Sequence, residues 1–360
     1  MAKAIRADIY DILTDCNIQW HYLSDRTVLV TGATGLIGTA LVHAISAANE
    51  KYALNIRLIA HGRNKNKGDA LVRELGIEFV PGDIREPSAG LNGCKTFEYV
   101  FHCAAITKSA DMLAKPVDVI HTELGGIRNM LELAKAKGCI SFVYLSSMEV
   151  YGQTELHEVF ESDLGSLDLS NPRSSYPEGK RLSEMLCVAY AAQYSMDVKI
   201  ARLAQTFGAG TNINDSRVFA QFLRSVINGT DIKLHTDGKS RGNYCYISDT
   251  IRGIITVLLK GESGETYNIS NPATSTTIRE MAELVANKIG KGNIKVDIDI
   301  PDDIKSRGYA PDSGFTLNVD KLKSLGWAPK YELVEMYRRM LECNVNARGV
   351  QERYEQNQEQ

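Results

Sequence analysis

A short apolar run that leads directly into three spaced glycines constrains this chain more than any other feature. Residues 27–38 read TVLVTGATGLIG, a predicted strand followed by a tight turn and a helix start. Gly32 permits the turn, Gly35 lets the backbone approach a pyrophosphate, and Gly38 lets the helix lie close to the strand. Free N–H groups at the helix start favour an anion. The segment predicts a dinucleotide-binding turn, with a purely structural turn as the alternative.

Strand-like and helix-like segments alternate after this turn. The apolar runs VLV, YVFHC and FVYLS are continuous, which is typical of parallel strands buried on both faces. We therefore predict an α/β fold with a doubly wound parallel sheet. Its strands are predicted at residues 27–31, 56–60, 99–102, 142–146 and 198–203, between helices that include 37–48, 117–137 and 180–194.

The alternation weakens after Gly208, which suggests a division of the chain. We predict a Rossmann domain at residues 26–208 and a smaller C-terminal substrate lobe at 209–345, with segments such as 244–259 returning to the first domain. Residues 1–25 carry four apolar residues at helical spacing, which predicts a helical extension packed on its own domain or on another subunit. Residues 346–360 form a polar tail, either a frayed helix end or disordered.

Composition excludes several classes of protein. The formal net charge of −3 disfavours a strongly basic nucleic-acid binder, and no apolar run approaches the roughly 20 residues that cross a bilayer. The N-terminal residues lack the apolar stretch of a secretory signal, so we expect a cytoplasmic protein. Seven scattered cysteines without a C-x-x-C pair, and seven histidines without ligand spacing, predict no metal site.

A tyrosine and a lysine four residues apart form the first candidate catalytic pair. Tyr176 and Lys180 lie near the start of a predicted helix, with Ser174 or Ser175 as the cap, and the spacing puts both on one face. A nearby ammonium lowers the pKa of a tyrosine, which would make Tyr176 an acid–base group near neutral pH. The pattern is common by chance. It gains weight from LSSMEVYG at residues 145–152, at the carboxyl end of the preceding strand, where ligands of such sheets bind.

The end of the second predicted strand bears on which dinucleotide binds. An acidic residue there would favour NAD, but the segment reads HGRNK. Arg63, together with Lys65, would accept a 2′-phosphate, so the sequence slightly favours NADP over NAD; a solvated loop arginine is the alternative. Asp83 and Ile84 follow the third apolar run, where a carboxylate would reach the adenine.

Several motifs in order give the chain a resemblance to extended short-chain dehydrogenase/reductases of the NAD-dependent epimerase/dehydratase family, which act on nucleotide sugars. They are TGATGLIG, DI, HCAA at 102–105, SSMEVYG, YPEGK and LGWAPK at 325–330, and they span about residues 27–329. Within the family the chain is most similar to UDP-glucuronate decarboxylases. The resemblance implies cofactor contacts from Gly32, Thr34, Gly35, Leu36, Ile37, Gly38, Arg63, Asp83, Ile84, Ala104, Ala105, Tyr176 and Lys180.

The resemblance also implies catalytic roles. Tyr176 would remove the proton of the sugar 4-hydroxyl as hydride passes to the nicotinamide, and Lys180 would hold the nicotinamide ribose. Ser147 would hydrogen-bond the reacting hydroxyl. Glu149 matches a glutamate that acts as a base beside the sugar, with a salt-bridged glutamate at a strand end as the alternative. The implied substrate contacts are Ser147, Met148, Gln205, Arg217, Arg241 and Arg307.

Two of these positions depart from the family pattern. Met148 stands where a 4,6-dehydratase has a proton-donating aspartate and a decarboxylase usually has a serine, so elimination of water is disfavoured and decarboxylation is weakened. Gln205 stands where relatives often have an asparagine that touches the diphosphate.

We therefore expect an NAD(P)-dependent epimerase for a nucleotide sugar or nucleotide polyol. A UDP-glucuronate-decarboxylase-like enzyme, an NADPH-dependent keto-sugar reductase and a non-enzymatic dinucleotide sensor are the alternatives. Helices 117–137 and 180–194 resemble those through which relatives form homodimers, although their apolar positions would equally suit a core.

Overall fold

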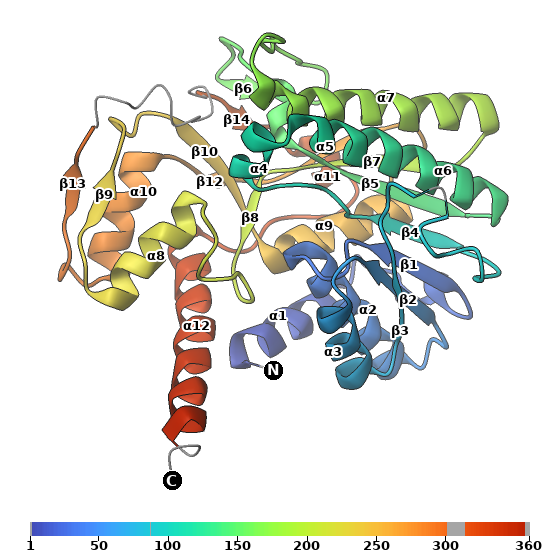
Figure 1. Ribbon diagram of the computed structural model, residues 1–360, viewed down its shortest axis with the longest axis horizontal. Helices are drawn as coiled ribbons and strands as arrows, with labels where there is room; N and C mark the ends of the chain where they lie inside the picture. Colours follow the sequence, from blue (N-terminus) through green and yellow to red (C-terminus); the bar gives the residue numbers. More distant parts are fainter. Residues whose placement is uncertain (1, 87, 301–313, 357–360) are drawn as a thin grey trace.

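A seven-stranded sheet forms the centre of the protein, as described by a computed structural model that covers residues 2–86, 88–300 and 314–356 (Figure 1). The strand order is β11-β7-β5-β4-β1-β2-β3, and every neighbouring pair is parallel. The chain thus builds outward from β1 in both directions, which leaves a crevice at the carboxyl ends of the strands. The predicted doubly wound fold is confirmed. The strands are β1 (Thr27–Thr31), β2 (Arg57–Gly62), β3 (Glu78–Pro81), β4 (Tyr99–His102), β5 (Ser141–Ser147), β7 (Val198–Leu203) and β11 (Thr266–Ile269).

Helices cover both faces of this sheet, which explains its apolar strands. All of β1 is buried; Val28 and Val30 pack into one core cluster, whereas Leu29 packs into a second cluster on the opposite face. The first cluster includes residues of α2 (Leu36–Tyr52), α3 (Lys65–Leu75) and α9 (Ile247–Lys260). The second includes residues of α6 (Gly126–Ala136) and α7 (Ser175–Tyr194).

The helix predicted at residues 117–137 is interrupted. The structure contains α5 (Pro116–Ile120), a π-helical turn η2 (His121–Gly125) and then α6, while α4 (Ser109–Ala114) precedes them. Two consecutive glycines, Gly125 and Gly126, lie where the π turn meets α6. Because glycine stabilises regular helix poorly, this junction is a natural place for altered helical geometry. The prediction of a helix over these residues is confirmed, with a π-helical turn inside it.

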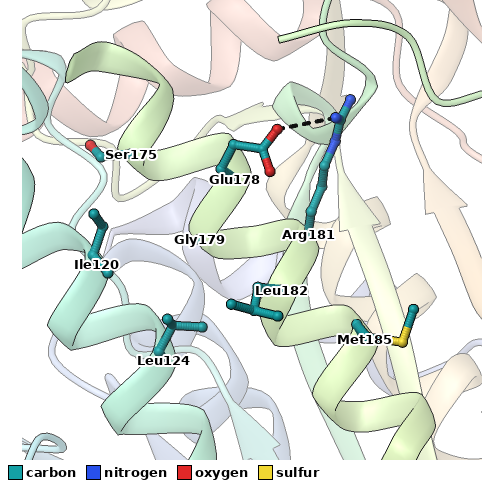
Figure 2. Close-up of a pocket in the computed structure, with 8 residues that line it drawn as sticks. All are labelled: Ile120, Leu124, Ser175, Glu178, Gly179, Arg181, Leu182 and Met185. Atoms are coloured by element: carbon teal, nitrogen blue, oxygen red, sulfur yellow. Dashed lines mark hydrogen bonds and ion pairs between the residues drawn. The ribbon is translucent and has the colours of Figure 1, made fainter. Parts of the chain in front are cut away.

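Helices α5 and α7 lie side by side and expose apolar side chains on a common outer face. Val117, Leu182 and Met185 are 61%, 54% and 62% exposed. Figure 2 shows Ile120 and Leu124 across a shallow hollow from Leu182 and Met185, with the Glu178–Arg181 ion pair (3.2 Å) on α7 beside it. We call this set the α5–α7 face: Val117, Ile120, Leu124, Leu182 and Met185.

A smaller lobe lies beside the carboxyl edge of the large sheet (Figure 1). It contains a three-stranded sheet of order β12-β10-β8 and the two-stranded pairs β13-β9 and β14-β6. The chain crosses between the two parts repeatedly, since α9 and β11 follow Gly208 yet belong to the large sheet's layers.

The remaining elements are η1 (Trp20–Leu23), η3 (Met148–Tyr151), β6 (Glu158–Val159), η4 (Pro172–Ser174), β8 (Gln205–Phe207), α8 (Val218–Asn228), β9 (Ile232–Leu234), β10 (Arg241–Tyr246), β12 (Asn271–Thr277), α10 (Ile278–Leu284), η5 (Val285–Ile289), β13 (Val296–Ile298), β14 (Thr316–Leu317), α11 (Asp320–Lys323) and α12 (Leu333–Gln356).

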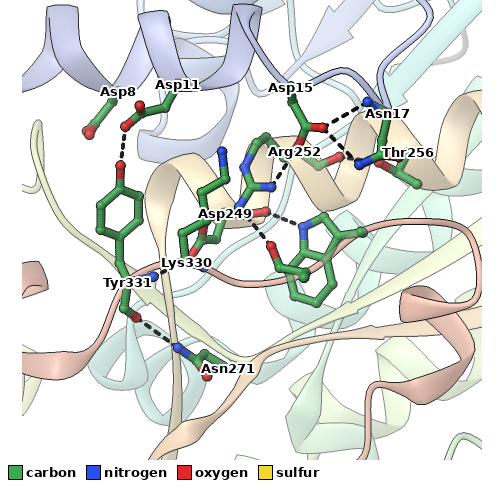
Figure 3. A network of polar contacts seen from close by, with 12 residues as sticks. Asp8, Asp11, Asp15, Asn17, Asp249, Arg252, Thr256, Asn271, Lys330 and Tyr331 are labelled. Atoms are coloured by element: carbon green, nitrogen blue, oxygen red, sulfur yellow. Dashed lines mark hydrogen bonds and ion pairs between the residues drawn. The ribbon is translucent and has the colours of Figure 1, made fainter.

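The N-terminal segment is anchored by charged side chains from late in the chain. Arg252 of α9 lies 2.7 Å from Asp15 and also contacts Asp249 (Figure 3). The Asp249 carboxylate accepts hydrogen bonds from the backbone N–H groups of Lys330 (2.8 Å) and Tyr331 (3.1 Å), which ties the segment before α12 to α9.

Helix α1 (Lys3–Leu13) joins the same network. Its buried Asp8 accepts hydrogen bonds from Tyr246 (2.8 Å) and from Arg339 of α12 (2.7 Å), and Tyr331 donates to Asp11. The N-terminal extension therefore packs on its own chain.

Helix α12 continues to Gln356, so much of the predicted polar tail has a helical backbone. Within the described ranges, no helix combines the length and the apolar character that a bilayer span requires.

Candidate active site

The predicted phosphate-binding turn has little room for side chains. Gly32 has φ of +66°, and a Cβ there would lie 2.8 Å from backbone atoms of Cys103 and Ala104. A Cβ on Gly38 would lie 2.3 Å from the carbonyl oxygen of Gly32. Helix α2 begins just after Gly35 with no side-chain cap, so its N-terminal N–H groups remain available to an anion. This geometry fits the pyrophosphate of a dinucleotide.

A large cavity of about 940 Å³ connects this turn with the smaller lobe. It lies where the reversal of strand order places the crevice of a doubly wound sheet. Among its lining residues are all the predicted site residues that the structure describes: Gly32, Thr34, Gly35, Leu36, Ile37, Gly38, Arg63, Asp83, Ile84, Ala104, Ala105, Ser147, Met148, Glu149, Tyr176, Lys180, Gln205, Arg217 and Arg241. Arg307 falls outside the described residues.

Two elements bring the predicted catalytic side chains together. Strand β5 ends at Ser147, whose hydroxyl accepts a hydrogen bond from the backbone N–H of Glu149 (3.2 Å) and so starts the turn η3. Helix α7 carries Tyr176 in its first turn and Lys180 one turn later, both buried. Tyr176 lies near enough to Ser147 for the serine hydroxyl to lower its pKa, and Lys180 donates to the carbonyl oxygen of Leu145 (2.8 Å).

One of the two serines predicted to cap this helix takes the cap position but makes no capping hydrogen bond. Ser174 does occupy the position before α7, but its hydroxyl donates to the carbonyl oxygen of Asp168 (2.7 Å) instead of accepting from the helix. Asn171 instead caps the preceding turn η4, where its side chain accepts from the N–H of Arg173 (3.0 Å). The local sequence therefore starts α7 through a short 3₁₀ turn rather than through a serine cap.

The predicted lowering of the Tyr176 pKa is not found in this structure. Burial raises the pKa of Tyr176 above its usual value, and the carboxylates of Glu123 and Glu149 raise it further, against a hydrogen bond from Ser147 and the charge of Arg173. Lys180 lies 3.0 Å from Glu123, so its positive charge is already compensated by a buried carboxylate.

Sequence reasoning missed a second ion pair at this site. The guanidinium of Arg173 donates to Glu149 at 2.6 Å, and Arg173 is buried whereas the Glu149 side chain is 37% exposed. The alternative of a salt-bridged Glu149 at a strand end is thus realised, although Glu149 still lines the cavity. An arginine three residues before Tyr176 was the only available signal.

Two arginines predicted to meet the substrate already hold partners in the protein. Arg217 chelates Asp215 at 2.7 and 3.0 Å just before α8. Arg241 donates to the carbonyl oxygen of Ser275 (3.1 Å). Both keep their side chains at the cavity, together with Gln205 of β8 and the buried Met148.

Charged residues also surround the end of the cavity near β2 and β3. Arg63 lines it, but Lys65 is turned away and pairs with Asp69 (2.8 Å); Lys67 takes its place in the lining. The Asp83 carboxylate, predicted to reach an adenine, pairs with Arg85 (2.7 Å), which lowers the pKa of Asp83.

Comparisons with known proteins agree with this geometry. The family model described as "NAD dependent epimerase/dehydratase family" matches residues 28–270. UDP-glucuronic acid decarboxylase 6 of Arabidopsis thaliana is 32% identical over 324 residues, which cover 87% of each chain.

Solved structures show the same fold. UDP-glucose 4-epimerase of Thermotoga maritima, solved with UDP-glucose, aligns with a TM-score of 0.76 at 22% identity over 89% of this chain and 99% of its own. A dTDP-glucose 4,6-dehydratase of Streptomyces venezuelae, solved with NAD, aligns with a TM-score of 0.76 at 24% identity over 90% of this chain and 98% of its own. With a family model that covers most of its length, this chain belongs to the NAD-dependent epimerase/dehydratase family.

Proposed function

We propose that this chain is an NAD(P)-dependent nucleotide-sugar epimerase that works through a transient keto sugar. The observation that carries the proposal is that Ser147, Tyr176 and Lys180 meet in the same cavity as the glycine-lined start of α2. A dinucleotide on that turn and a sugar in the rest of the cavity would share one enclosed space. The solved relatives that bind nucleotide sugars and NAD support this reading.

The residues suit oxidation of a sugar alcohol. A bound nicotinamide ring supplies a reversible hydride acceptor. Tyr176 takes the hydroxyl proton as the C–H bond breaks, and Ser147 hydrogen-bonds the oxygen that becomes the carbonyl. The positive charge of a bound nicotinamide would offset the burial that otherwise disfavours the Tyr176 phenolate. Epimerisation follows when the ketone presents its other face, because hydride then returns to carbon and Tyr176 returns the proton to oxygen. Met148 offers no acidic proton, which disfavours loss of a hydroxyl as water.

Decarboxylation of UDP-glucuronate is a second candidate, favoured by the 32% identity to a plant UDP-glucuronic acid decarboxylase. A ketone at C4 of a glucuronate makes the C6 carboxylate a β-keto acid. The C5–C6 bond can then break to release carbon dioxide, with its electron pair moving toward the C4 oxygen. Protonation at C5 and return of hydride to C4 complete a UDP-pentose. Glu149 lies at the cavity beside this chemistry.

A single substrate screen separates these reactions. The purified protein is incubated with UDP-, dTDP-, GDP- and CDP-linked sugars, and with UDP-glucuronate, in the presence of NAD⁺ or NADPH. Epimerisation yields an isomer without net cofactor turnover, decarboxylation releases one carbon dioxide per substrate, and keto-sugar reduction consumes NADPH stoichiometrically. Tight dinucleotide binding without turnover of any of these compounds would instead support a sensor.

We also propose that the protein forms a homodimer through the α5–α7 face. A second copy would place its own α5 and α7 on this face, and a two-fold axis makes such an apolar stripe complementary to itself. Sedimentation velocity should show a dimer that Leu182→Glu converts to monomer. Leu169→Glu changes an even more exposed leucine, 78% exposed, outside this face and should leave the dimer intact. A monomeric wild-type protein would overturn this proposal.

The predicted cytoplasmic location stays a prediction.

A further inference from the structure

A buried carboxylate lies against the candidate catalytic lysine. Oε2 of Glu123 is 3.0 Å from the Lys180 ammonium, and the two side chains are 1% and 3% exposed. The Tyr144 hydroxyl donates to the same oxygen at 3.1 Å. No motif in the sequence analysis pointed to Glu123.

The backbone is shaped to admit this side chain. Glu123 lies in the π turn η2, a geometry that proteins often use at functional sites. On the facing helix α7, a Cβ at Gly179 would lie 3.3 Å from both Cβ and Cγ of Glu123. The absence of a side chain at Gly179 therefore leaves space for the carboxylate to reach Lys180.

We propose that Glu123 is a positioning residue that holds Lys180 and compensates its charge, so that the Lys180–Glu123 ion pair, rather than Lys180 alone, is the electrostatic partner of Tyr176. This inference rests on the proposed acid–base role of Tyr176. The inference extends that role because it assigns the pH at which Tyr176 ionises to Glu123, a residue of another helical segment.

The groups that face Tyr176 and Lys180 from the surrounding elements are consistent with this assignment. Burial lowers the pKa of His102 on β4 to about 3, so this imidazole is neutral. Burial also raises the pKa of the Cys103, Tyr144 and Cys187 side chains, which keeps them neutral. Two ion pairs therefore supply charge beside Tyr176. One is Arg173–Glu149, and the other is Lys180–Glu123, whose ammonium lies 5.8 Å from the centre of the Tyr176 ring.

The expected consequence is a change in the pH at which Tyr176 ionises. Glu123 disfavours the phenolate, so replacing its carboxylate with a neutral amide leaves the Lys180 charge free to stabilise that phenolate. A phenolate beside the positively charged nicotinamide of NAD⁺ also strengthens NAD⁺ binding. By linkage, the affinity for NAD⁺ then reports the ionisation of Tyr176 without requiring any turnover.

The test is calorimetric titration with NAD⁺ between pH 6 and 10 on wild type, Glu123→Gln, Glu123→Asp and Tyr176→Phe. In wild type, the affinity for NAD⁺ should change in one step as the pH passes through the pKa of Tyr176, and Tyr176→Phe should abolish this step. Glu123→Gln should lower the pH midpoint of the step by at least one pH unit. If the wild-type step lies above pH 10, a step that is visible between pH 6 and 10 only in Glu123→Gln supports the proposal equally. Glu123→Asp keeps the charge and should keep the step within half a unit of wild type.

Controls separate this inference from the proposed function. Glu184→Gln removes a different buried carboxylate of α7, which pairs with Arg202 (2.7 Å) and does not line the cavity; it should not move the step. A Tyr176-dependent step at the same pH in wild type and Glu123→Gln, or an equal shift in Glu123→Asp, overturns the role of Glu123 alone. A complete absence of a Tyr176-dependent step in every variant overturns the role of Tyr176 and this inference together.

Discussion

The guanidinium of Arg173, in the turn η4 that precedes Tyr176, donates a hydrogen bond to the Glu149 carboxylate at 2.6 Å. The glutamate that the family resemblance assigns as a base is thus held by a buried arginine at the edge of the cavity. This contact fixes the carboxylate while more than a third of it stays accessible. Arg173 therefore contributes to the site by positioning Glu149.

The first prediction concerns this pair. Glu149→Gln keeps the shape but removes the base, so we expect formation of any product that requires proton movement at C5 to fall about 10²- to 10⁴-fold, while oxidation of the sugar at C4 persists. Single-turnover absorbance at 340 nm should show reduced cofactor that accumulates instead of being reoxidised. Arg173→Met should reduce product formation by a smaller factor. Normal turnover in Glu149→Gln would show that the carboxylate only supports the local structure.

The second prediction concerns Tyr176. Tyr176→Phe removes the phenol and should lower turnover about 10²- to 10⁴-fold, with dinucleotide binding retained. The matched control is Tyr190→Phe on the same helix, where the hydroxyl contacts Glu132 outside the cavity. Unchanged product formation in Tyr176→Phe would refute the proposed mechanism.

The third prediction concerns the glycine-lined turn. Gly38→Ala places a methyl group 2.3 Å from the Gly32 carbonyl oxygen, so the turn or α2 must shift, at a cost of about 1–3 kcal/mol. We expect a lower melting temperature and weaker NAD⁺ binding by calorimetry. Gly125→Ala, where a Cβ meets nothing within 4 Å, provides the control. Equal NAD⁺ affinity in wild type and Gly38→Ala would count against pyrophosphate binding at this turn.

The fourth prediction concerns the choice of dinucleotide. Because Arg63 lines the cavity after β2, Arg63→Ala should weaken NADP⁺ binding about tenfold or more and leave NAD⁺ binding nearly unchanged. Lys65→Ala should alter neither, since Lys65 pairs with Asp69. Parallel titrations with the two dinucleotides measure the ratio, and an equal loss for both would argue against contact with a 2′-phosphate.

The fifth prediction concerns stability and pH. Burial raises the pKa of Asp8 to about 6 in the folded state from 3.8 in the unfolded chain. The folded state therefore binds this proton more tightly, and the resulting stabilisation is full below pH 3.8 and is lost as the pH rises through 6. The difference corresponds to about 3 kcal/mol. Thermal unfolding at pH 5 and pH 8 should differ less in Asp8→Asn than in wild type; an equal difference would show that Asp8 does not titrate in this range.

Sequence reasoning located the central sheet well because its strands are continuous apolar runs between helices. The bounds predicted for β1, β4 and β7 match the structure, and those of β2 and β5 differ by one or two residues. It did not predict β11, which pairs with β7 across more than sixty intervening residues and carries no local pattern that sets it apart. Short strands such as β9 and β13 were missed for the same reason, since pairing partners far along the chain define them.

The sequence predicted which residues line the site but not which charged side chains pair with one another there. Spacing and family motifs indicated which side chains share the cavity, because glycines, the serine and the tyrosine–lysine pair recur in fixed order. The partners of the charged groups depend on tertiary packing instead. Nothing near Lys180 in the sequence predicts Glu123 at 3.0 Å. The predicted direction of the Tyr176 pKa was wrong because burial raises this pKa and the carboxylates of Glu123 and Glu149 raise it further.

The contacts of Asp8 with Arg339 and of Asp15 with Arg252 have a consequence during synthesis on the ribosome. Helix α1 emerges first, yet Asp8 on this helix and Asp15 just after it find their cationic partners only after more than two hundred further residues have been translated. The N-terminal segment can pack on α2 early, but its ion pairs with α9 and α12 form only after these helices have left the exit tunnel. A chain that stops short of Arg339 lacks the guanidinium that pairs with Asp8.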